Sequence, residues 1–223
     1  MRIGIDANWA IYEKAGIGKY TKNLIKNLVR YDKKNEYILF LNYFRQPEER
    51  LRAIKAIIKD SRAKVTLEIH PYPAKIKQLL LQTMLPANWI FKQEIDLFYV
   101  PFFDGVPKVG WDKMVVTIYD LAFMKFPDHR GKRLSKYYLK RTKQAVENCQ
   151  KVIAISESTK KDLVTMLKVD SKKIEVVYAA ISNEFEVIKN QKDVEKVVSK
   201  YLPKKQKYIL AVGTLEPRKN LTR

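Results

Sequence analysis

The stretch that decides the fold is Val152-Ile153-Ala154-Ile155-Ser156-Glu157-Ser158-Thr159, in which a short apolar run leads directly into a helix start. Four consecutive apolar residues are typical of a strand that is buried on both faces. Ser156 then stands where an N-cap residue belongs, because its hydroxyl can accept a hydrogen bond from a free backbone N–H of the first helical turn. The pattern predicts a strand followed at once by a helix over 157–167, which is the repeating unit of an α/β fold.

The same alternation of strand and helix signals continues along the whole chain. Short apolar runs predict strands at Arg2–Asp6, Tyr37–Leu41, Val65–Ile69, Leu97–Val100, Met114–Tyr119, Val152–Ile155, Ile174–Tyr178 and Tyr208–Val212. Helical spacing predicts a helix that contains Tyr20, Leu24, Ile25 and Leu28 on one face, and further helices at 47–59, 133–148, 157–167 and 193–201. We therefore expect an α/β fold with a Rossmann-like, doubly wound parallel sheet.

The segment between Ala74 and Glu94 is apolar and basic and is interrupted by Pro86. Its amphipathic pattern suits a helix that covers the sheet, and it also suits a membrane surface. The sequence leaves both interpretations open.

The chain is strongly basic, with 44 Lys and Arg against 24 Asp and Glu and a net charge of +20. Such an excess attracts phosphorylated molecules, nucleic acids or acidic lipid headgroups, and it does not choose among them. The single cysteine, Cys149, can form no internal disulfide and has no clustered zinc ligands around it, so we expect it to be structural. Without a long apolar run or a signal peptide, we expect a cytoplasmic protein with no transmembrane helix.

Two glycines precede the first predicted helix in Ala15-Gly16-Ile17-Gly18-Lys19-Tyr20. Glycines allow backbone N–H groups to approach an anion at the positive end of a helix. The third glycine of a dinucleotide-binding fingerprint is replaced by Thr21, and Gly16 stands ten positions after Asp6, the last residue of the first predicted strand. We therefore expect a long loop that closes over a phosphate or a sugar, and a plain glycine turn is the alternative.

A second candidate position lies at the end of a central strand, in Thr117-Ile118-Tyr119-Asp120-Leu121. A carboxylate that a rigid strand delivers to the edge of the sheet can orient the hydroxyl groups of a polar substrate. Asp120 could equally be a local loop cap.

The third candidate follows the predicted strand Tyr208–Val212, where Gly213 opens a turn that contains Arg218 and Lys219. Arginine can bind a phosphate in a bidentate manner and lysine adds a compact charge, so the pair suits a nucleotide diphosphate.

Four segments in this order resemble the retaining glycosyltransferases of the GT4 family. They are Gly16–Leu24, Tyr119-Asp120-Leu121 through Pro127, Val152–Thr159 with Asp162-Leu163, and Val212–Asn220. The family has the GT-B fold, in which two Rossmann-like domains face each other across a cleft. The likeness spans nearly the whole chain and is strongest to mannosyltransferase-like members.

The resemblance implies that the chain is the N-terminal half of a GT-B fold with only the first strand and turn of the second domain. It assigns residues 1–185 to the acceptor-binding domain, 186–207 to a linker and 208–223 to the start of the nucleotide-sugar-binding domain. The site residues that it implies are Asp120 and Tyr119 as catalytic, Gly16, Ile17, Gly18, Arg218 and Lys219 as donor-phosphate-binding, and Lys19 and Tyr20 on the acceptor side.

The chain departs from the family pattern at three points. The family often has histidine where Tyr119 stands, and many members have arginine where Thr214 stands, which leaves the cationic role to Arg218 and Lys219. The acidic E-x7-E motif of the second domain does not occur in these residues.

The function that we expect is transfer of a sugar, with mannose suggested by the resemblance, from a nucleotide-sugar donor to a glycan or lipid-linked acceptor with retention. We expect no metal or other cofactor, no nucleic-acid partner, and an inactive isolated chain because the donor-site glutamates are absent. Peripheral contact with the anionic inner face of the membrane is left open. Two alternatives remain: a nucleotide- or NAD-binding Rossmann protein without transfer chemistry, and a basic nucleic-acid-binding module whose affinity falls steeply with salt.

Overall fold

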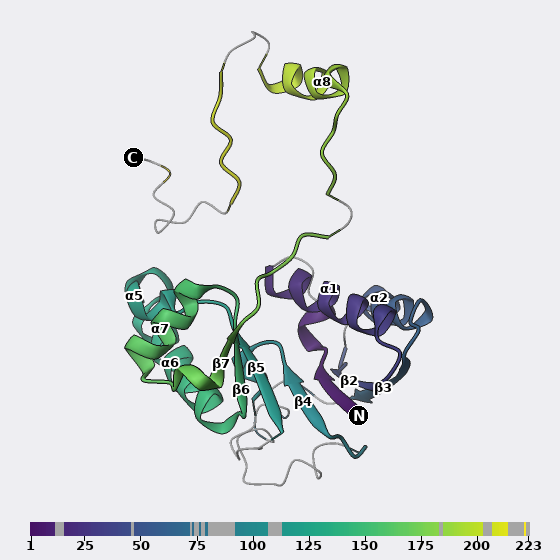
Figure 1. Ribbon diagram of the computed structural model, residues 1–223, viewed down its shortest axis with the longest axis vertical. Coiled ribbons are helices and arrows are strands. Elements are labelled where there is room, and N and C mark those ends of the chain that lie inside the picture. Colours follow the sequence, from purple (N-terminus) through teal and green to yellow (C-terminus); the bar gives the residue numbers. More distant parts are fainter. Residues whose placement is uncertain are drawn as a thin grey trace. The chain divides into compact units, whose positions relative to one another are not determined.

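The computed structural model describes residues 1–11, 16–45, 47–71, 73, 76, 79, 92–106, 113–182, 185–202, 207–213 and 221. Met1–Ala179 form one compact unit, and Ala180–Arg223 form a second group of residues. The first unit contains a sheet with helices on both sides, as Figure 1 shows.

The sheet has seven strands in the order β3-β2-β1-β4-β5-β6-β7, and every neighbouring pair is parallel. The strands are β1 (Arg2–Asp6), β2 (Glu36–Asn42), β3 (Lys64–His70), β4 (Leu97–Val100), β5 (Met114–Ile118), β6 (Lys151–Ala154) and β7 (Ile174–Val176). This order is that of a doubly wound Rossmann-like domain, so the predicted fold class is confirmed. The seven predicted strands of this unit are also confirmed, with ends that differ by at most two residues.

The two faces of the sheet bury two separate apolar clusters, because successive side chains of a strand point to opposite faces. In β2, Tyr37, Leu39 and Leu41 belong to one cluster, and Ile38 and Phe40 belong to the other. All five are buried, as expected for a strand that helices cover on both sides.

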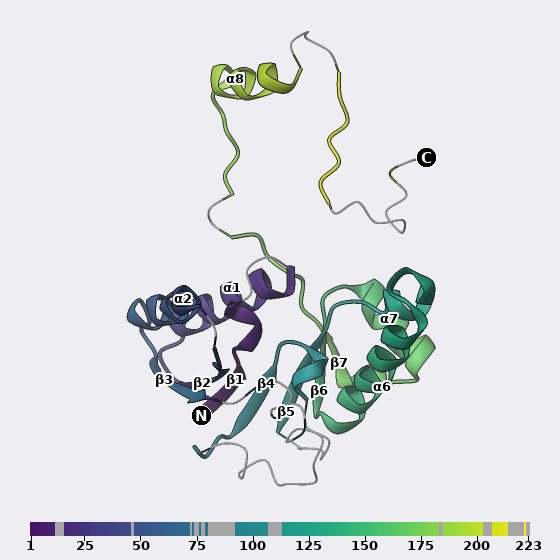
Figure 2. The ribbon, with the colours of Figure 1, turned by 180° about the vertical axis from the view of Figure 1, so that it is seen from behind.

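The helices of the first unit divide between these faces. Those whose bounds lie within the described residues are α1 (Gly16–Tyr31), α2 (Glu48–Lys59), α5 (Ala122–Lys125), α6 (Lys132–Asn148) and α7 (Glu157–Leu167), with short 3-10 turns η1 (Asn8–Ile11), η2 (Phe103–Gly105), η3 (Pro127–Arg130) and η4 (Ser171–Lys173). Residues of α1 and α2 pack in the cluster that contains Leu39, and residues of α6 and α7 pack in the cluster that contains Phe40. Figures 1 and 2 show α1 and α2 on one side and α5, α6 and α7 on the other.

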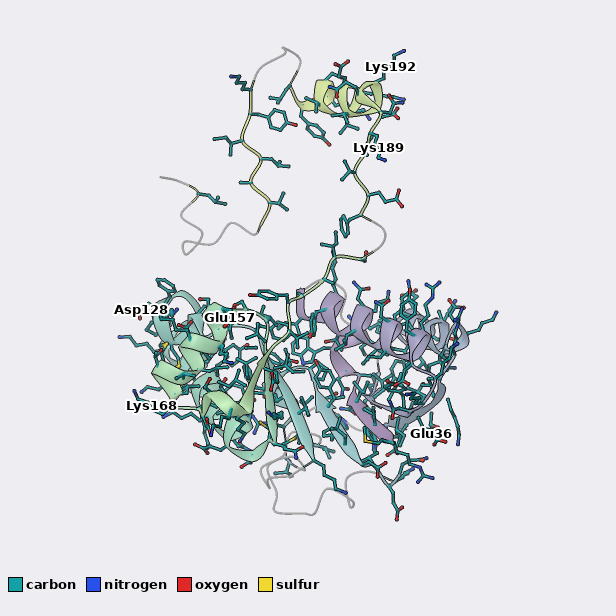
Figure 3. The ribbon with its side chains drawn as sticks, in the orientation of Figure 1. Glu36, Asp128, Glu157, Lys168, Lys189 and Lys192 are labelled. Atoms are coloured by element: carbon teal, nitrogen blue, oxygen red, sulfur yellow. The ribbon has the colours of Figure 1, made fainter. Side chains whose placement is uncertain are left out.

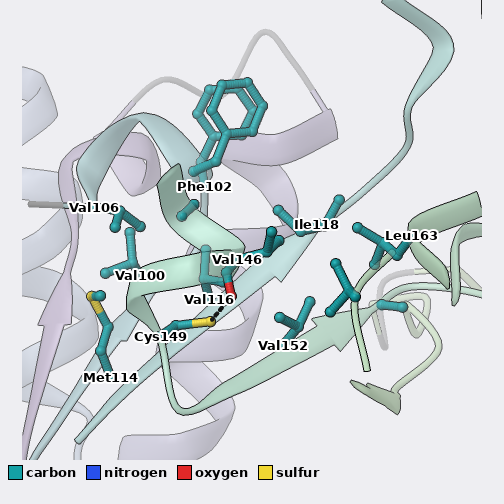
Figure 4. Close-up of a cluster of buried hydrophobic side chains, with 14 of the residues drawn as sticks. Val100, Phe102, Val106, Met114, Val116, Ile118, Val146, Cys149, Val152 and Leu163 are labelled. Atoms are coloured by element: carbon teal, nitrogen blue, oxygen red, sulfur yellow. Dashed lines mark hydrogen bonds between the residues drawn. The ribbon is translucent and has the colours of Figure 1, made fainter. Parts of the chain in front are cut away.

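Cys149 belongs to the core, as the sequence predicts. It is 5% exposed and lies among apolar residues of β5, β6 and α6, where its Sγ donates a hydrogen bond to the Val146 carbonyl at 3.7 Å (Figure 4). Burial raises the pKa of the Cys149 thiol to about 11. The thiol is therefore protonated at neutral pH and acts as a small apolar group.

The predicted cap of α7 is confirmed. The Ser156 hydroxyl accepts a hydrogen bond from the backbone N–H of Thr159 at 3.1 Å. The helix ends at Lys168, which has a φ of 58° in the left-handed region. Local residue chemistry thus sets the start of this helix, whereas its C-terminal cap is a lysine whose backbone N–H donates to the Leu163 carbonyl.

The second group of residues contains α8 (Gln191–Tyr201), which confirms the helix predicted at 193–201. The strand predicted at Tyr208–Val212 is wrong. Residues 207–213 form no strand, and Ile209 is 99% exposed. Apolar β-forming residues make a strand only when a neighbour accepts their backbone hydrogen bonds, and in the described part of the chain no strand pairs with this segment.

Most of the amphipathic segment between Ala74 and Glu94 lies outside the described residues. No helix in the described ranges is long and apolar enough to cross a membrane.

Candidate functional site

The point where the sheet reverses its winding lies between β1 and β4. These strands are neighbours, but the chain leaves β1 toward β2 on one side and leaves β4 toward β5 on the other. The loops at their carboxyl ends therefore diverge, and in open α/β sheets ligands bind at this position. The candidate site is built from the residues that follow β1, β4 and β5.

A buried carboxylate ends β1. Asp6 is 4% exposed, and its Oδ1 accepts hydrogen bonds from both the backbone N–H and the side-chain amide of Asn8. The Asn8 Oδ1 in turn accepts from the backbone N–H of Asn42 at 2.8 Å, at the end of β2. This network fixes the start of the loop after β1 against the neighbouring strand.

The loop after β4 packs directly against this carboxylate. A Cβ atom placed on Gly105 would lie 2.3 Å from the Asp6 Oδ2 and 3.0 Å from the Val100 Cγ1. Only a residue without a side chain allows the η2 backbone to approach Asp6 this closely. Glycine at 105 therefore brings the two loops together.

A buried arginine of α6 holds the other side of the same loop. Arg141 is 2% exposed, and its Nη2 donates to the carbonyls of Asp104 and Val106, each at 2.8 Å. Its Nε lies 3.4 Å from the Asp104 Oδ1, and its Nη1 donates to Gln144 at 2.7 Å. The Tyr137 hydroxyl also donates to the Asp104 carboxylate. These bonds satisfy a buried charge and hold η2 against α6.

Aromatic rings connect the three loops. The Trp9 ring meets the Phe102 ring edge-on at 4.9 Å, and the Phe102 ring lies 6.4 Å from that of Tyr119. Tyr119 in turn meets Tyr20 of α1 edge-on at 5.4 Å. Residues that follow β1, β4 and β5 therefore pack together with the first turns of α1.

The two residues predicted as catalytic differ in accessibility. Asp120 is exposed at the carboxyl end of β5, and its Oδ1 accepts from the backbone N–H of Ala122 at 3.0 Å. One carboxylate oxygen is thus used as a local cap, while the side chain still reaches solvent. The hydroxyl of Tyr119 is buried and makes no hydrogen bond within the described residues, whereas its carbonyl accepts from Thr159 Oγ1 at 2.8 Å.

Burial raises the pKa of Tyr119 well above the usual range of a phenol. It also raises the pKa of Tyr99, whose hydroxyl lies 2.6 Å from the Thr117 Oγ1 beneath this site. Both phenols therefore stay neutral near pH 7, and neither can act as a base there. Asp120 is the carboxylate that the end of β5 presents to solvent.

The predicted glycines lie inside α1 rather than in a loop before it. The helix begins at Gly16, so Gly16, Ile17 and Gly18 form its first turn, in which backbone N–H groups have no partner within the helix. Gly18 is buried, and Lys19 is exposed. Tyr20 is brought to Tyr119, as described above. The loop predicted between β1 and the first helix therefore ends before Gly16 rather than including the two glycines. Residues 12–15 lie outside the described ranges.

The remaining predicted site residues, Arg218 and Lys219, also lie outside the described ranges. Within the described residues, no group of three or more His, Cys, Asp or Glu side chains could hold a metal ion. Metal independence stays a prediction.

Comparison with known proteins places this arrangement in a family. A family model described as Glycosyltransferase Family 4 matches residues 15–185, which include α1, the loop after β4 and Asp120. The chain belongs to Glycosyltransferase Family 4. The resemblance found in the sequence motifs is therefore confirmed.

Two curated relatives carry related descriptions. The chain is 21% identical over 220 residues to O-antigen chain mannosyltransferase B of Escherichia coli, covering 94% of this chain and 55% of that protein. It is 28% identical over 108 residues to O-antigen chain mannosyltransferase RfbU of Salmonella typhimurium, covering 48% of this chain and 26% of that protein. The chain thus spans about half the length, or less, of these relatives.

Among solved structures, the chain is similar to Alr3699/HepE of Anabaena, whose crystal structure is a complex with UDP-glucose. The TM-score is 0.46 at 14% sequence identity, and the match covers 91% of this chain and 49% of that chain.

Sequence reasoning missed Asp6, Gly105 and Arg141. A signal existed for the first two, since Asp6 ends a predicted strand and Gly105 follows another, where a ligand site is expected. Arg141 had a weaker signal, because it falls on the apolar face of a helix that contains many exposed cations. Nothing in the local sequence indicated that these three residues meet at one loop.

Proposed function

We propose that this chain is the acceptor-binding half of a glycosyltransferase that transfers mannose from a nucleotide-sugar donor to a glycan or lipid-linked acceptor with retention. In this proposal residues 1–185 bind the acceptor, 186–207 are a linker, and 208–223 belong to the domain that binds the donor. The main support for this proposal is that the family match covers the carboxyl edge of the sheet, where α1, the loop after β4 and Asp120 come together. The descriptions of the two relatives as mannosyltransferases support the choice of sugar.

The proposed chemistry depends on position and charge. Departure of a nucleoside diphosphate develops negative charge, which unpaired N–H groups and cations stabilise. The first turn of α1 at Gly16–Gly18 would supply such N–H groups, and Arg218 with Lys219 would supply cations. The exposed carboxylate of Asp120 would orient hydroxyl groups of the sugars in the cleft, with Tyr119 packed behind it. No metal or cofactor takes part in this proposal.

The test is a binding and turnover experiment with chain 1–223. We expect saturation-transfer NMR to detect binding of mannose-containing acceptor glycans to the chain. We expect no transfer of sugar to these glycans when GDP-mannose or UDP-glucose is added. Replacement Asp120→Asn keeps an oxygen for the cap on Ala122 and removes the charge, so it should weaken acceptor binding. The exposed Asp128→Asn on the same edge is the control.

Two outcomes would contradict the proposal. Binding of NAD without affinity for glycans or sugar nucleotides would point to a different Rossmann-like function. Turnover by the chain alone would show that the assignment of the donor site to another domain is wrong.

A further inference from the structure

The start of α6 carries a group of exposed cations. Between Leu121 and Val146 the sequence contains eight Lys and Arg and one acidic residue, Asp128. Lys132, Arg133 and Lys136 are exposed and form no ion pair within the described residues. The charge of this region is therefore available to an external anion.

Large apolar side chains are exposed beside these cations. Phe126 is 47% exposed and Leu134 is 40% exposed. The segments that carry them are joined, because the hydroxyl of Ser135 donates to the carbonyl of Pro127 at 2.9 Å. We call Phe126, Lys132, Arg133, Leu134 and Lys136 the basic rim.

Three residues of the basic rim also line a surface hollow. A cavity of about 480 Å³ is lined by Gly131, Lys132, Arg133, Leu134 and Tyr137. This volume is within the range of small-molecule sites, and its lining combines two cations with apolar side chains. Cations beside apolar side chains match the chemistry of a phospholipid, whose phosphate is anionic and whose acyl chains are apolar.

The basic rim lies on the carboxyl edge of the sheet. Figure 3 shows Asp128 and Glu157 on this edge and Glu36, which begins β2, on the opposite edge. The edge that carries the candidate site is thus also the edge that carries the basic rim.

We propose that the basic rim is a docking surface for a bilayer that contains anionic phospholipid. Lys132, Arg133 and Lys136 pair with lipid phosphates, and Phe126 and Leu134 enter the boundary between headgroups and acyl chains. Charge complementarity selects an anionic partner. The exposed leucine and phenylalanine favour a bilayer over a nucleic acid, since a leucine side chain offers no ring on which a base could stack. This inference is independent of the proposed sugar transfer.

Cosedimentation of chain 1–223 with phosphatidylcholine vesicles, with and without phosphatidylglycerol, tests the proposal. We expect binding only when phosphatidylglycerol is present, and weaker binding at high ionic strength. Each cation near an anionic surface strengthens binding roughly five-fold, so Lys132→Glu with Arg133→Glu should weaken it by at least about thirty-fold. Glutamate is favourable in a first helical turn, so this variant should fold.

The matched control is Lys33→Glu with Lys34→Glu, which changes the charge equally on the opposite edge just before β2. A second pair separates the apolar contribution: Phe126→Ser should weaken binding, whereas Tyr31→Ser, at a side chain that is 62% exposed near the end of α1, should not.

Equal losses in the two charge variants would show that total charge rather than the basic rim determines binding, and would overturn the proposal. Binding that does not depend on phosphatidylglycerol would also overturn it. So would an oligonucleotide that displaces the vesicles and itself requires Lys132 and Arg133, because the surface would then be a nucleic-acid site.

Discussion

Replacement Gly105→Ala tests whether the loops after β1 and β4 are held together as described. The new Cβ would lie 2.3 Å from the Asp6 Oδ2, whereas ordinary contact begins near 3.4 Å, so the carboxylate would have to move by about 1.1 Å. Asp6 cannot turn away freely, because it is buried and its other oxygen holds Asn8. Overpacking of this kind costs about 1–3 kcal/mol, and the reduced freedom of the unfolded chain offsets about 0.4–1 kcal/mol of it.

We therefore expect Gly105→Ala to lower the free energy of unfolding by about 1–2 kcal/mol. For a domain of this size the melting temperature should fall by roughly 2–8 °C, as measured by circular dichroism. Gly16→Ala is the matched control, because nothing lies within 4 Å of its added Cβ and it stands in the first turn of α1. That variant should be as stable as the wild type or more stable by up to about 1 kcal/mol.

A double-mutant cycle with Asp6→Ala isolates the contact. Removing the carboxylate removes the clash, so the double variant should be more stable than the sum of the two single effects predicts. An unchanged melting temperature for Gly105→Ala, together with an additive cycle, would refute the described approach of the two loops.

Three further predictions concern other parts of the first unit. Arg141→Lys keeps the charge but cannot satisfy the loop carbonyls and Asp104 together, so it should lower the free energy of unfolding in urea by about 2–4 kcal/mol. The exposed Arg133→Lys should cause no measurable loss, and an equal loss there would contradict the proposed role of Arg141 in holding the loop after β4. Ser156→Ala should cost about 1 kcal/mol through loss of the helix cap; Ser156→Asp should retain stability, and failure to do so would argue against capping. Hydrogen bonds, led by that from the side chain of Asn35, lower the pKa of Asp32. Its stabilising contribution is present above the unfolded pKa near 4 and is lost as the pH falls toward the lowered value. In Asp32→Asn the free energy of unfolding should therefore fall less between neutral and acidic pH than it does in the wild type. An unchanged pH dependence would contradict this.

Local chemistry in the sequence was sufficient for the regular elements of the sheet. β1 and β4 have the predicted ends, and β4 is a short apolar run between Asp96 and Pro101. The cap at Ser156 was equally predictable, since a hydroxyl and the N–H three residues later need no distant partner. The position of Asp120 after the end of β5 was predictable for a similar reason, because carboxyl ends of parallel strands meet at one edge, and its role stays a prediction.

The same local reasoning failed at Tyr208–Val212. Its residues favour extended structure as strongly as those of β2, but a strand also requires a neighbour. Ile209 is almost fully exposed, whereas Leu39 in β2 is fully buried in the cluster with residues of α1 and α2. Strand propensity alone therefore cannot distinguish a paired segment from an unpaired one.

The sequence by itself determined the alternation of strands and helices, the basic character of the surface and the motifs of the family, because each depends on neighbouring residues or on composition. Only the tertiary structure decided that Gly105 meets Asp6 and that Arg141 holds the loop after β4. The Arg141 contacts join residues 35 and 37 positions apart, because α6 packs against the loop after β4. The approach of Gly105 to Asp6 exists because β1 and β4 are neighbours in the sheet. Contacts of this kind follow from the order of strands in space, which no local pattern of residues specifies.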